Sequence, residues 1–126
     1  MKQIVAVIRP RKINETKEAL IKAGLSAFTA VKVLGRGRGN VDFRVLRGAE
    51  DGTEEAIARL GDGPMLISKR MMTIVVPDDK APTVIQCIID NNKTGTAGDG
   101  KIFVLPVHET IRIRTGGRDS IALQEQ

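Results

Sequence analysis

The glycine-rich segment at residues 94–101, with the sequence TGTAGDGK, could bind a phosphate group. Glycines let several backbone N–H groups approach an anion, and Lys101 would add a positive charge. The spacing fits G-x-x-x-x-G-K, but Ile102 stands where a P-loop needs Ser or Thr to hold Mg²⁺. The segment also joins a helix pattern to a strand pattern, the reverse of a P-loop. A P-loop ATPase is therefore excluded, whereas phosphate binding and a plain turn after a helix both stay open.

Arginines form candidate anion-binding groups in two other segments. Residues 35–39 alternate glycine with Arg36 and Arg38, and each guanidinium can hold a phosphate through two hydrogen bonds. This segment lacks the last glycine of the G-x-G-x-x-G dinucleotide motif, and a solvated hinge is the alternative interpretation. Arg112 and Arg114 would lie about 7 Å apart on one face of a strand, either around an anion or on a charged edge strand. The convergence of three cationic segments favours one site for a polyanion.

Groups for catalysis are scarce in this sequence. His108 is the only histidine and Cys87 the only cysteine, so a Ser-His or Cys-His arrangement would rest on one residue. The single cysteine also excludes a disulfide within the chain and a cysteine-based zinc site. Asp78 and Asp79 are better explained as the cap of a helix than as metal ligands. We therefore expect a protein that is not an enzyme.

The composition narrows the class of protein and of ligand. The 126 residues fit one domain, and 41% hydrophobic with 28% charged residues is typical of a soluble globular protein. No apolar run reaches the ~20 residues of a membrane span, and no signal-peptide pattern opens the sequence, so we expect a cytoplasmic location. The net charge of +5 favours anionic partners. Three phenylalanines are the only aromatic residues, which argues against stacking single-stranded nucleic acid.

The hydrophobic pattern predicts the elements that must position these segments. Strands are expected at 3–8, 28–34, 71–76, 102–105 and 110–115, and helices at 14–23 and from about 80 to 90, with Asn14 and Asp78 or Asp79 as caps. Only 54–60 looks helical between 41 and 68. Because strand–helix–strand occurs twice, we predict a βαββαβ ferredoxin-like sandwich of the α+β class. Its antiparallel sheet would carry two helices on one face and leave the other for solvent or a partner.

Six segments together resemble the PII signal-transduction family (GlnB and GlnK type): IVAVIRPRK, VLGRGRG, FRVLRGAE, TIVVPDD, TGTAGDGKIFV and IRIRTG. The resemblance covers nearly the full length and implies a trimer with the same fold. It implies ATP or ADP in the clefts between subunits, and 2-oxoglutarate bound with Mg²⁺-ATP. It also implies a single domain over 1–126, a T-loop at about 39–68 that contacts a target protein, and a C-terminal segment at 113–126. A mixed assembly with a paralogue stays open beside the self-trimer.

Two sets of binding residues follow from the resemblance by position. The implied ATP or ADP site consists of Thr29, Gly35, Gly37, Arg38, Val75, Gly98, Asp99, Gly100, Lys101, Arg112 and Arg114. The implied 2-oxoglutarate site consists of Arg9, Gly39, Lys69 and Gly98. No protein ligand of the metal is assigned, since Mg²⁺ would be held through the ATP phosphates and 2-oxoglutarate.

Three departures from the family pattern point to a subgroup. Gly39 stands where a glutamine commonly ligates Mg²⁺, Asp51 replaces a tyrosine that enteric relatives uridylylate, and extra residues precede Lys69. The longer loop, with LSAFTAVKVLGRG and SKRMMTIVV, resembles the nitrogen-fixation (NifI) subgroup and its second paralogue. That subgroup inhibits dinitrogenase, so the expected target is dinitrogenase. The alternatives are a GlnK-like regulator of an ammonium transporter and, less favoured, an RNA-binding module of the same topology.

Overall fold

The computed structural model describes residues 1–36 and 66–123. The chain divides into two compact units, residues 1–32 with 69–126 and residues 33–68. The expected helix at 54–60 and most of the expected T-loop lie outside the described residues, as do Gly37, Arg38, Gly39 and Asp51. None of the described helices is long and apolar enough to cross a membrane.

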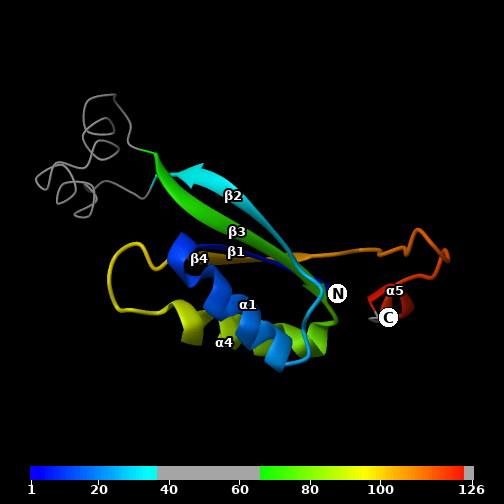
Figure 1. Cartoon of the computed structure of the whole chain (residues 1–126). Helices are drawn as coiled ribbons and strands as arrows, with labels where there is room; N and C mark the ends of the chain where they lie inside the picture. Colours follow the sequence, from blue (N-terminus) through cyan, green and yellow to red (C-terminus); the bar gives the residue numbers. More distant parts are fainter. Residues whose placement is uncertain (37–65, 124–126) are drawn as a thin grey trace, which may run out of the picture. The chain divides into compact units, whose positions relative to one another are not determined.

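Four strands form one sheet in the order β2-β3-β1-β4. β1 pairs antiparallel with both β3 and β4, so that Ile4 lies opposite Ile74 on one side and Val104 on the other. Helices α1 and α4 lie together on one face of the sheet (Figure 1). The predicted ferredoxin-like α+β sandwich is therefore confirmed. The elements are β1 (Lys2–Ile8), α1 (Ile13–Lys22), β2 (Thr29–Gly35), β3 (Ile67–Val76), α4 (Ala81–Asn92), β4 (Lys101–Pro106) and α5 (Ser120–Leu123).

The core lies between the sheet and the two helices. Alternate residues of β1 and β3 are buried, as the period of two in a strand requires. On α1 and α4 the residues that face the sheet recur at helical spacing. The buried apolar side chains are Ile4, Ala6, Ile8, Leu20, Leu25, Met72, Ile74, Val76, Ala81, Val84 and Ile88.

A buried polar contact joins the two helices. Asn92 Nδ2 donates hydrogen bonds to Thr16 Oγ1 at 3.0 Å and to the Ile88 carbonyl at 2.8 Å. The Thr16 hydroxyl in turn donates to the Lys12 carbonyl at 2.8 Å. Because each of these contacts has a defined geometry, they fix how α4 lies against α1 more narrowly than apolar packing alone.

The other face of the sheet carries apolar side chains that no other element of residues 1–36 and 66–123 covers. Phe103 lies opposite Val5 and Leu105 opposite Gln3, so these residues share the face turned away from Ile4. Phe103 is 51% exposed and Leu105 is 42% exposed. This face therefore matches the expectation of a surface left for solvent or a partner.

The predicted helix caps were wrong, because each helix is entered through a 3₁₀ turn. Asn14 lies inside α1, which follows the turn Pro10–Lys12, and α4 follows the turn Asp78–Lys80. Backbone hydrogen bonds close both turns, and neither helix has a side-chain cap. Asp78 instead forms an ion pair with the N-terminal amino group at 2.9 Å. Its hydrogen bond to this group lowers the pKa of the Asp78 carboxyl.

The predicted strand at 110–115 was also wrong. Only an isolated bridge joins Ile111 to Arg118, and the chain turns between them. The backbone N–H of Arg112 donates to the Gly117 carbonyl, and that of Gly116 donates to the Arg112 carbonyl, both at 2.7 Å. Alternating Ile and Arg fit a strand only beside another strand, and no strand of the described residues pairs with this segment. Arg112 and Arg114 therefore do not share one face of a strand.

Replacing Leu20 with Ala is expected to lower the free energy of unfolding by about 2–5 kcal/mol, because its side chain is fully buried and would leave a cavity. The neighbouring Ile21 is 53% exposed and provides the control, since Ile21→Ala should change stability by about 0.5 kcal/mol or less. Urea denaturation at one fixed protein concentration measures both. Equal losses at the two positions would contradict the assignment of the core.

Candidate anion-binding site

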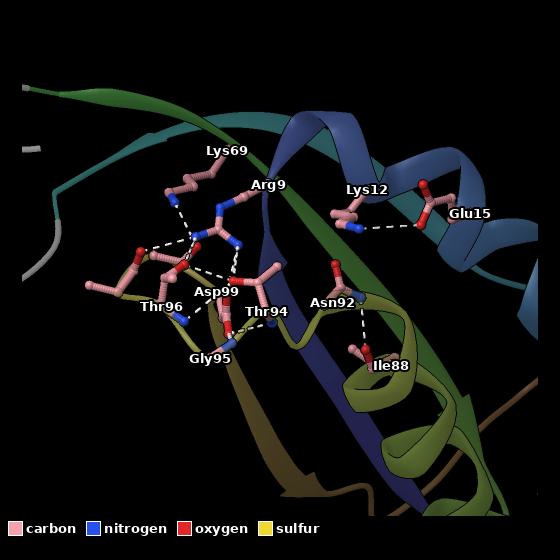
Figure 2. Close-up of polar contacts among 12 residues, drawn as sticks. Arg9, Lys12, Glu15, Lys69, Ile88, Asn92, Thr94, Gly95, Thr96 and Asp99 are labelled. Atoms are coloured by element: carbon pink, nitrogen blue, oxygen red, sulfur yellow. Dashed lines mark hydrogen bonds and ion pairs between the residues drawn. The ribbon is translucent and has the colours of Figure 1, made fainter. Parts of the chain in front are cut away.

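Three segments meet at one end of the sheet. Because β1 is antiparallel to β3 and β4, the end of β1 lies beside the beginnings of both neighbours. Arg9 follows β1, Lys69 lies near the beginning of β3, and Lys101 begins β4 after the loop at 93–100. Figure 2 shows the side chains of Arg9 and Lys69 directed toward this loop. We call this group the loop end: Arg9, Lys69, Gly98, Asp99, Gly100 and Lys101.

The guanidinium group of Arg9 is buried and bound on both terminal nitrogens. Nη1 donates to Asp99 Oδ1 at 2.6 Å and to Thr94 Oγ1 at 3.4 Å. Nη2 donates to Thr96 Oγ1 at 3.2 Å and to the Ala97 carbonyl at 3.0 Å. The whole residue is only 3% exposed. All of these partners belong to the glycine-rich loop, so Arg9 holds this loop against the end of β1.

The Asp99 carboxylate organises the loop from within. Oδ1 accepts from Arg9 and, through a short contact, from the Thr94 hydroxyl, while Oδ2 accepts from the backbone N–H groups of Thr94 at 2.8 Å and Gly95 at 3.0 Å. The hydrogen bonds from Thr94, with those from Arg9 and Gly95, hold the pKa of Asp99 far below its usual range. Because that pKa is lower than in the unfolded chain, the stabilisation is fully present above about pH 4 and is lost progressively as the pH falls below it.

Three glycines of the loop, Gly95, Gly98 and Gly100, have backbones that other residues adopt at a cost, and the last two are also closely packed. Gly98 has φ +96° and Gly100 has φ +112°. A Cβ atom on Gly98 would lie 3.2 Å from Nη2 of Arg9, and one on Gly100 would lie 2.1 Å from the Val7 carbonyl oxygen. Lys69 Nζ donates to the Gly98 carbonyl at 3.3 Å. The loop backbone is thus tightly packed, with Lys69 beside it and Lys101 directly after it. This arrangement suits close approach by phosphate oxygens.

Four other described candidates form a second group at the opposite end of the sheet. Val75 lies six residues along β3 from Lys69, a separation of roughly 20 Å at 3.3 Å per residue. β2 begins at the same end as Val75, and the chain after β4 leaves there too (Figure 1). We call this group the far end: Thr29, Val75, Arg112 and Arg114. The described part of one chain therefore does not bring all the predicted nucleotide residues together.

Four other residues that the sequence singled out have separate surroundings. Arg112 Nη2 donates to the Ile121 carbonyl at 2.8 Å, which holds the arginine against the C-terminal segment. Gly35 ends β2. His108 is exposed in an irregular stretch. Burial, with a contribution from the nearby Asp90 carboxylate, raises the pKa of the Cys87 thiol.

Thr94, Thr96 and Ala97 take part in the site, and the sequence analysis missed them. Thr94 Oγ1 and Thr96 Oγ1 lie 2.7 Å apart, and both contact Arg9. Their signal was present in the sequence. Two threonines flank a glycine, with an aspartate five residues after the first, and such short polar side chains commonly close a loop onto its own backbone.

The candidate anion site has few side chains that could ligate a metal ion. No group of three or more His, Cys, Asp or Glu side chains gathers within residues 1–36 and 66–123. At the loop end the one carboxylate, Asp99, already accepts hydrogen bonds on both oxygens. The glycine backbone and the lysines fit the phosphates of a nucleotide. A Mg²⁺ ion at the loop end would take its oxygen ligands from the bound molecules themselves.

Comparisons with known proteins agree with this picture. Residues 1–117 match the family described as nitrogen regulatory protein P-II. The nitrogen fixation nifHD region GlnB-like protein 2 of Methanobacterium ivanovii is 46% identical over 129 residues, covering 96% of this chain and 99% of the relative. Its counterpart in Methanococcus maripaludis is 42% identical and covers 98% of this chain and all of the relative.

A solved structure gives the same assignment. The crystal structure of Arabidopsis thaliana PII bound to citrate has a TM-score of 0.73 and 32% identity, covering 99% of this chain and 91% of that chain. The resemblance inferred from the sequence motifs is thereby confirmed. This chain belongs to the P-II family of nitrogen regulatory proteins.

Proposed function

We propose that this chain is a nitrogen-regulatory sensor without enzymatic activity that binds ATP or ADP between two copies of itself. The observation that carries the proposal is the separation of its cations into the loop end and the far end. A triphosphate needs several positive charges close together. Lys69 and Lys101 lie at one end of the sheet and Arg112 and Arg114 are reached from the other. A second copy that sets its far end against the loop end of the first would complete the site.

The uncovered face of the sheet supports assembly into a trimer. Phe103 and Leu105 are exposed on this face, and apolar surface of this kind is commonly buried between subunits. A ring of three copies would repeat the junction of loop end and far end three times. A mixed ring with a paralogue would use the same junctions. We further propose that the protein acts in the cytoplasm.

In this proposal 2-oxoglutarate binds beside the nucleotide, near Lys69 and Gly98, within the cluster that includes Arg9. Two carboxylates next to a triphosphate repel it unless a cation lies between them. Mg²⁺, held by phosphate and 2-oxoglutarate oxygens, would supply that cation. Gly39 offers no side chain as a further ligand.

Binding of 2-oxoglutarate is therefore expected to require Mg²⁺-ATP. Isothermal titration of 2-oxoglutarate into the protein should show heat of binding with Mg²⁺-ATP and none with the protein alone or with ATP and a chelator. The same affinity under all three conditions would contradict the proposed bridging cation. Titration with glutarate, which has the same five carbons and two carboxylates but lacks the 2-oxo group, is the matched ligand control.

The proposed target is dinitrogenase, contacted through residues 39–68. Several of the relatives are named for the nifHD region, which favours a role in nitrogen fixation. In the sequence, the segment lies between Arg38 and Lys69, both of which belong to the predicted ligand sites. Ligand occupancy would therefore act on both ends of the segment. We propose that ATP with 2-oxoglutarate releases the target.

A pull-down tests the target and its ligand dependence together. The tagged protein is incubated with purified dinitrogenase, with membranes that contain an ammonium transporter, or with bulk RNA. Each incubation is done with and without Mg²⁺-ATP plus 2-oxoglutarate. We expect the tagged protein to retain dinitrogenase without the ligands and to release it when they are present.

Retention of the transporter alone would favour the GlnK-like alternative, and salt-sensitive RNA binding would favour the nucleic-acid alternative. A variant with a short Gly-Ser linker in place of 39–68 is the control, and it should retain nothing.

A further inference from the structure

The side chain of Asn92, the last residue of α4, carries a buried oxygen atom without a partner. The residue is 5% exposed, and its Nδ2 donates to the Ile88 carbonyl at 2.8 Å and to Thr16 Oγ1 at 3.0 Å. A carbonyl only accepts hydrogen bonds, so the amide nitrogen must face Ile88 and the amide oxygen points away. That oxygen, Oδ1, is buried and has no hydrogen-bond partner within residues 1–36 and 66–123. Burying it is unfavourable, and a leucine, with the same number of side-chain heavy atoms, would avoid the penalty. Core packing alone therefore does not account for an asparagine here.

The contacts of Asn92 connect the end of α4 to the turn that follows β1. Its nitrogen donates to the Thr16 hydroxyl oxygen, and this hydroxyl donates to the Lys12 carbonyl at 2.8 Å. The N–H of Lys12 in turn donates to the Arg9 carbonyl at 3.1 Å. Because each hydrogen bond has a preferred direction and length, the series ties the backbone at Arg9 to the last residue of α4.

The glycine-rich loop begins directly after this tie. α4 ends at Asn92, Lys93 follows, and the N–H of Thr94 already donates to Asp99 Oδ2 at 2.8 Å inside the loop. Figure 2 shows Asn92 at the end of α4, with the loop from Thr94 onward extending toward Arg9. The place of Asn92 therefore sets where the loop starts relative to the end of β1.

We propose that Asn92 is a positioning residue of the anion site. Through Thr16 it sets the beginning of the glycine-rich loop against the backbone at Arg9, and it touches neither the nucleotide nor 2-oxoglutarate. The side chain of Arg9 stays among the residues expected to meet 2-oxoglutarate. This inference rests on the proposed function, namely that the loop binds the nucleotide phosphates. Replacing a residue that only stabilises the core should lower stability and binding together, whereas replacing Asn92 should weaken binding with little change in stability.

The test compares Asn92→Leu, Thr16→Val and the double variant by titration with Mg²⁺-ATP and by urea denaturation. Each single variant should bind ATP about threefold to thirtyfold more weakly, as coupled residues away from a ligand do when replaced. The double variant should bind no more weakly than the weaker single variant, because both substitutions remove one contact. Its urea midpoint should lie within about 0.5 M of the wild type, since both partners become apolar together. Wild-type ATP affinity in the double variant, or a loss of affinity that accompanies a larger fall of the midpoint, would overturn the proposal.

Two further variants provide matched controls. Asn91 lies beside Asn92, but its Nδ2 donates to the Cys87 carbonyl of the same helix at 2.7 Å, so Asn91→Leu should bind ATP like the wild type. Thr16→Ser keeps the hydroxyl that accepts from Asn92 and donates to Lys12, so it should also retain ATP affinity. Equal weakening in Asn91→Leu and Asn92→Leu would overturn the proposal. So would equal weakening in Thr16→Ser and Thr16→Val, because the hydroxyl would then have no role.

Hydrogen exchange of the nucleotide-free proteins separates this inference from the proposed function. The N–H groups of Thr94 and Gly95 donate to Asp99 Oδ2 at 2.8 and 3.0 Å, so their exchange reports the shape of the loop. Both should exchange about threefold or more faster in Thr16→Val than in Thr16→Ser, while the amide of Val84 within α4 exchanges equally in the two. Equal rates at Thr94 and Gly95 would overturn the positioning role. If the wild type itself binds no ATP, the proposed function fails, and the exchange rates still decide whether the junction positions the loop.

Discussion

Lys101→Ala and Arg112→Ala chains assembled together are expected to regain ATP sites that neither variant has alone. Each substitution removes a charge-assisted contact and should weaken ATP roughly ten- to a hundredfold. Because Lys101 lies at the loop end and Arg112 at the far end, a mixed ring contains junctions where both are intact. Random mixing of equal amounts in trimers restores about a quarter of the junctions. Titration of a co-refolded mixture should reveal this fraction as a separate class of tight sites.

The matched control for this experiment mixes two variants of the same group. Lys69→Ala with Lys101→Ala should regain no tight sites, because no junction in such a ring has an intact loop end. Two different affinity tags, purified in sequence, establish that each mixture has exchanged chains. If co-assembled Lys101→Ala and Arg112→Ala chains bind ATP no better than either alone, the site does not draw on two copies.

Gly100→Ala is expected to be far more damaging than Gly95→Ala. Both glycines have positive φ, +112° and +82°, so an alanine costs about 1–2 kcal/mol at either position from backbone strain alone. Only at Gly100 does the added Cβ meet a backbone atom, the Val7 carbonyl oxygen at 2.1 Å, whereas Gly95 has open space around it. The pairing of β1 with β4 holds Val7 in place. The clash can therefore be relieved only by moving backbone atoms of the paired strands.

Urea denaturation and ATP titration of the two variants measure this difference. Gly95→Ala should lose about 1–2 kcal/mol of stability and keep most of its ATP affinity. Gly100→Ala should lose at least a further ~2 kcal/mol and bind ATP at least tenfold more weakly. Similar values for the two would show that the loop backbone relaxes around the new side chain, contrary to the packing seen here.

Hydrophobic periodicity was enough to predict the sheet and the two main helices, because each buries one face in a repeating pattern. Ile4, Ala6 and Ile8 alternate as a half-buried strand must, and their burial agrees. The same argument failed at Ile111 and Ile113, where an alternating pattern lies in a turn with no strand beside it. A period of two reports which side chains share a face and says nothing of whether a neighbour exists to pair with.

The candidate site was predictable in its residue types and less so in its contacts. Gly98, Gly100 and Lys101 could be chosen because glycines let backbone N–H groups approach an anion and a lysine adds a positive charge. The contacts of Arg9 with the glycine-rich loop were missed because they join residues about 90 positions apart, which no local pattern encodes. Asp99 was assigned to the nucleotide site, where its carboxylate proves to be engaged by the loop itself.

The uncovered sheet face affects the stability of a newly synthesised chain. With Phe103 and Leu105 open to water, folding of one copy does not finish the burial of its apolar surface. In the proposed ring this surface would be buried only when copies associate, so that part of the hydrophobic stabilisation would vary with the concentration of the protein. At low concentration a larger share of the chains would stay unassembled, with this apolar surface exposed. Under the proposed assembly, the expression level would therefore set how many complete nucleotide sites exist.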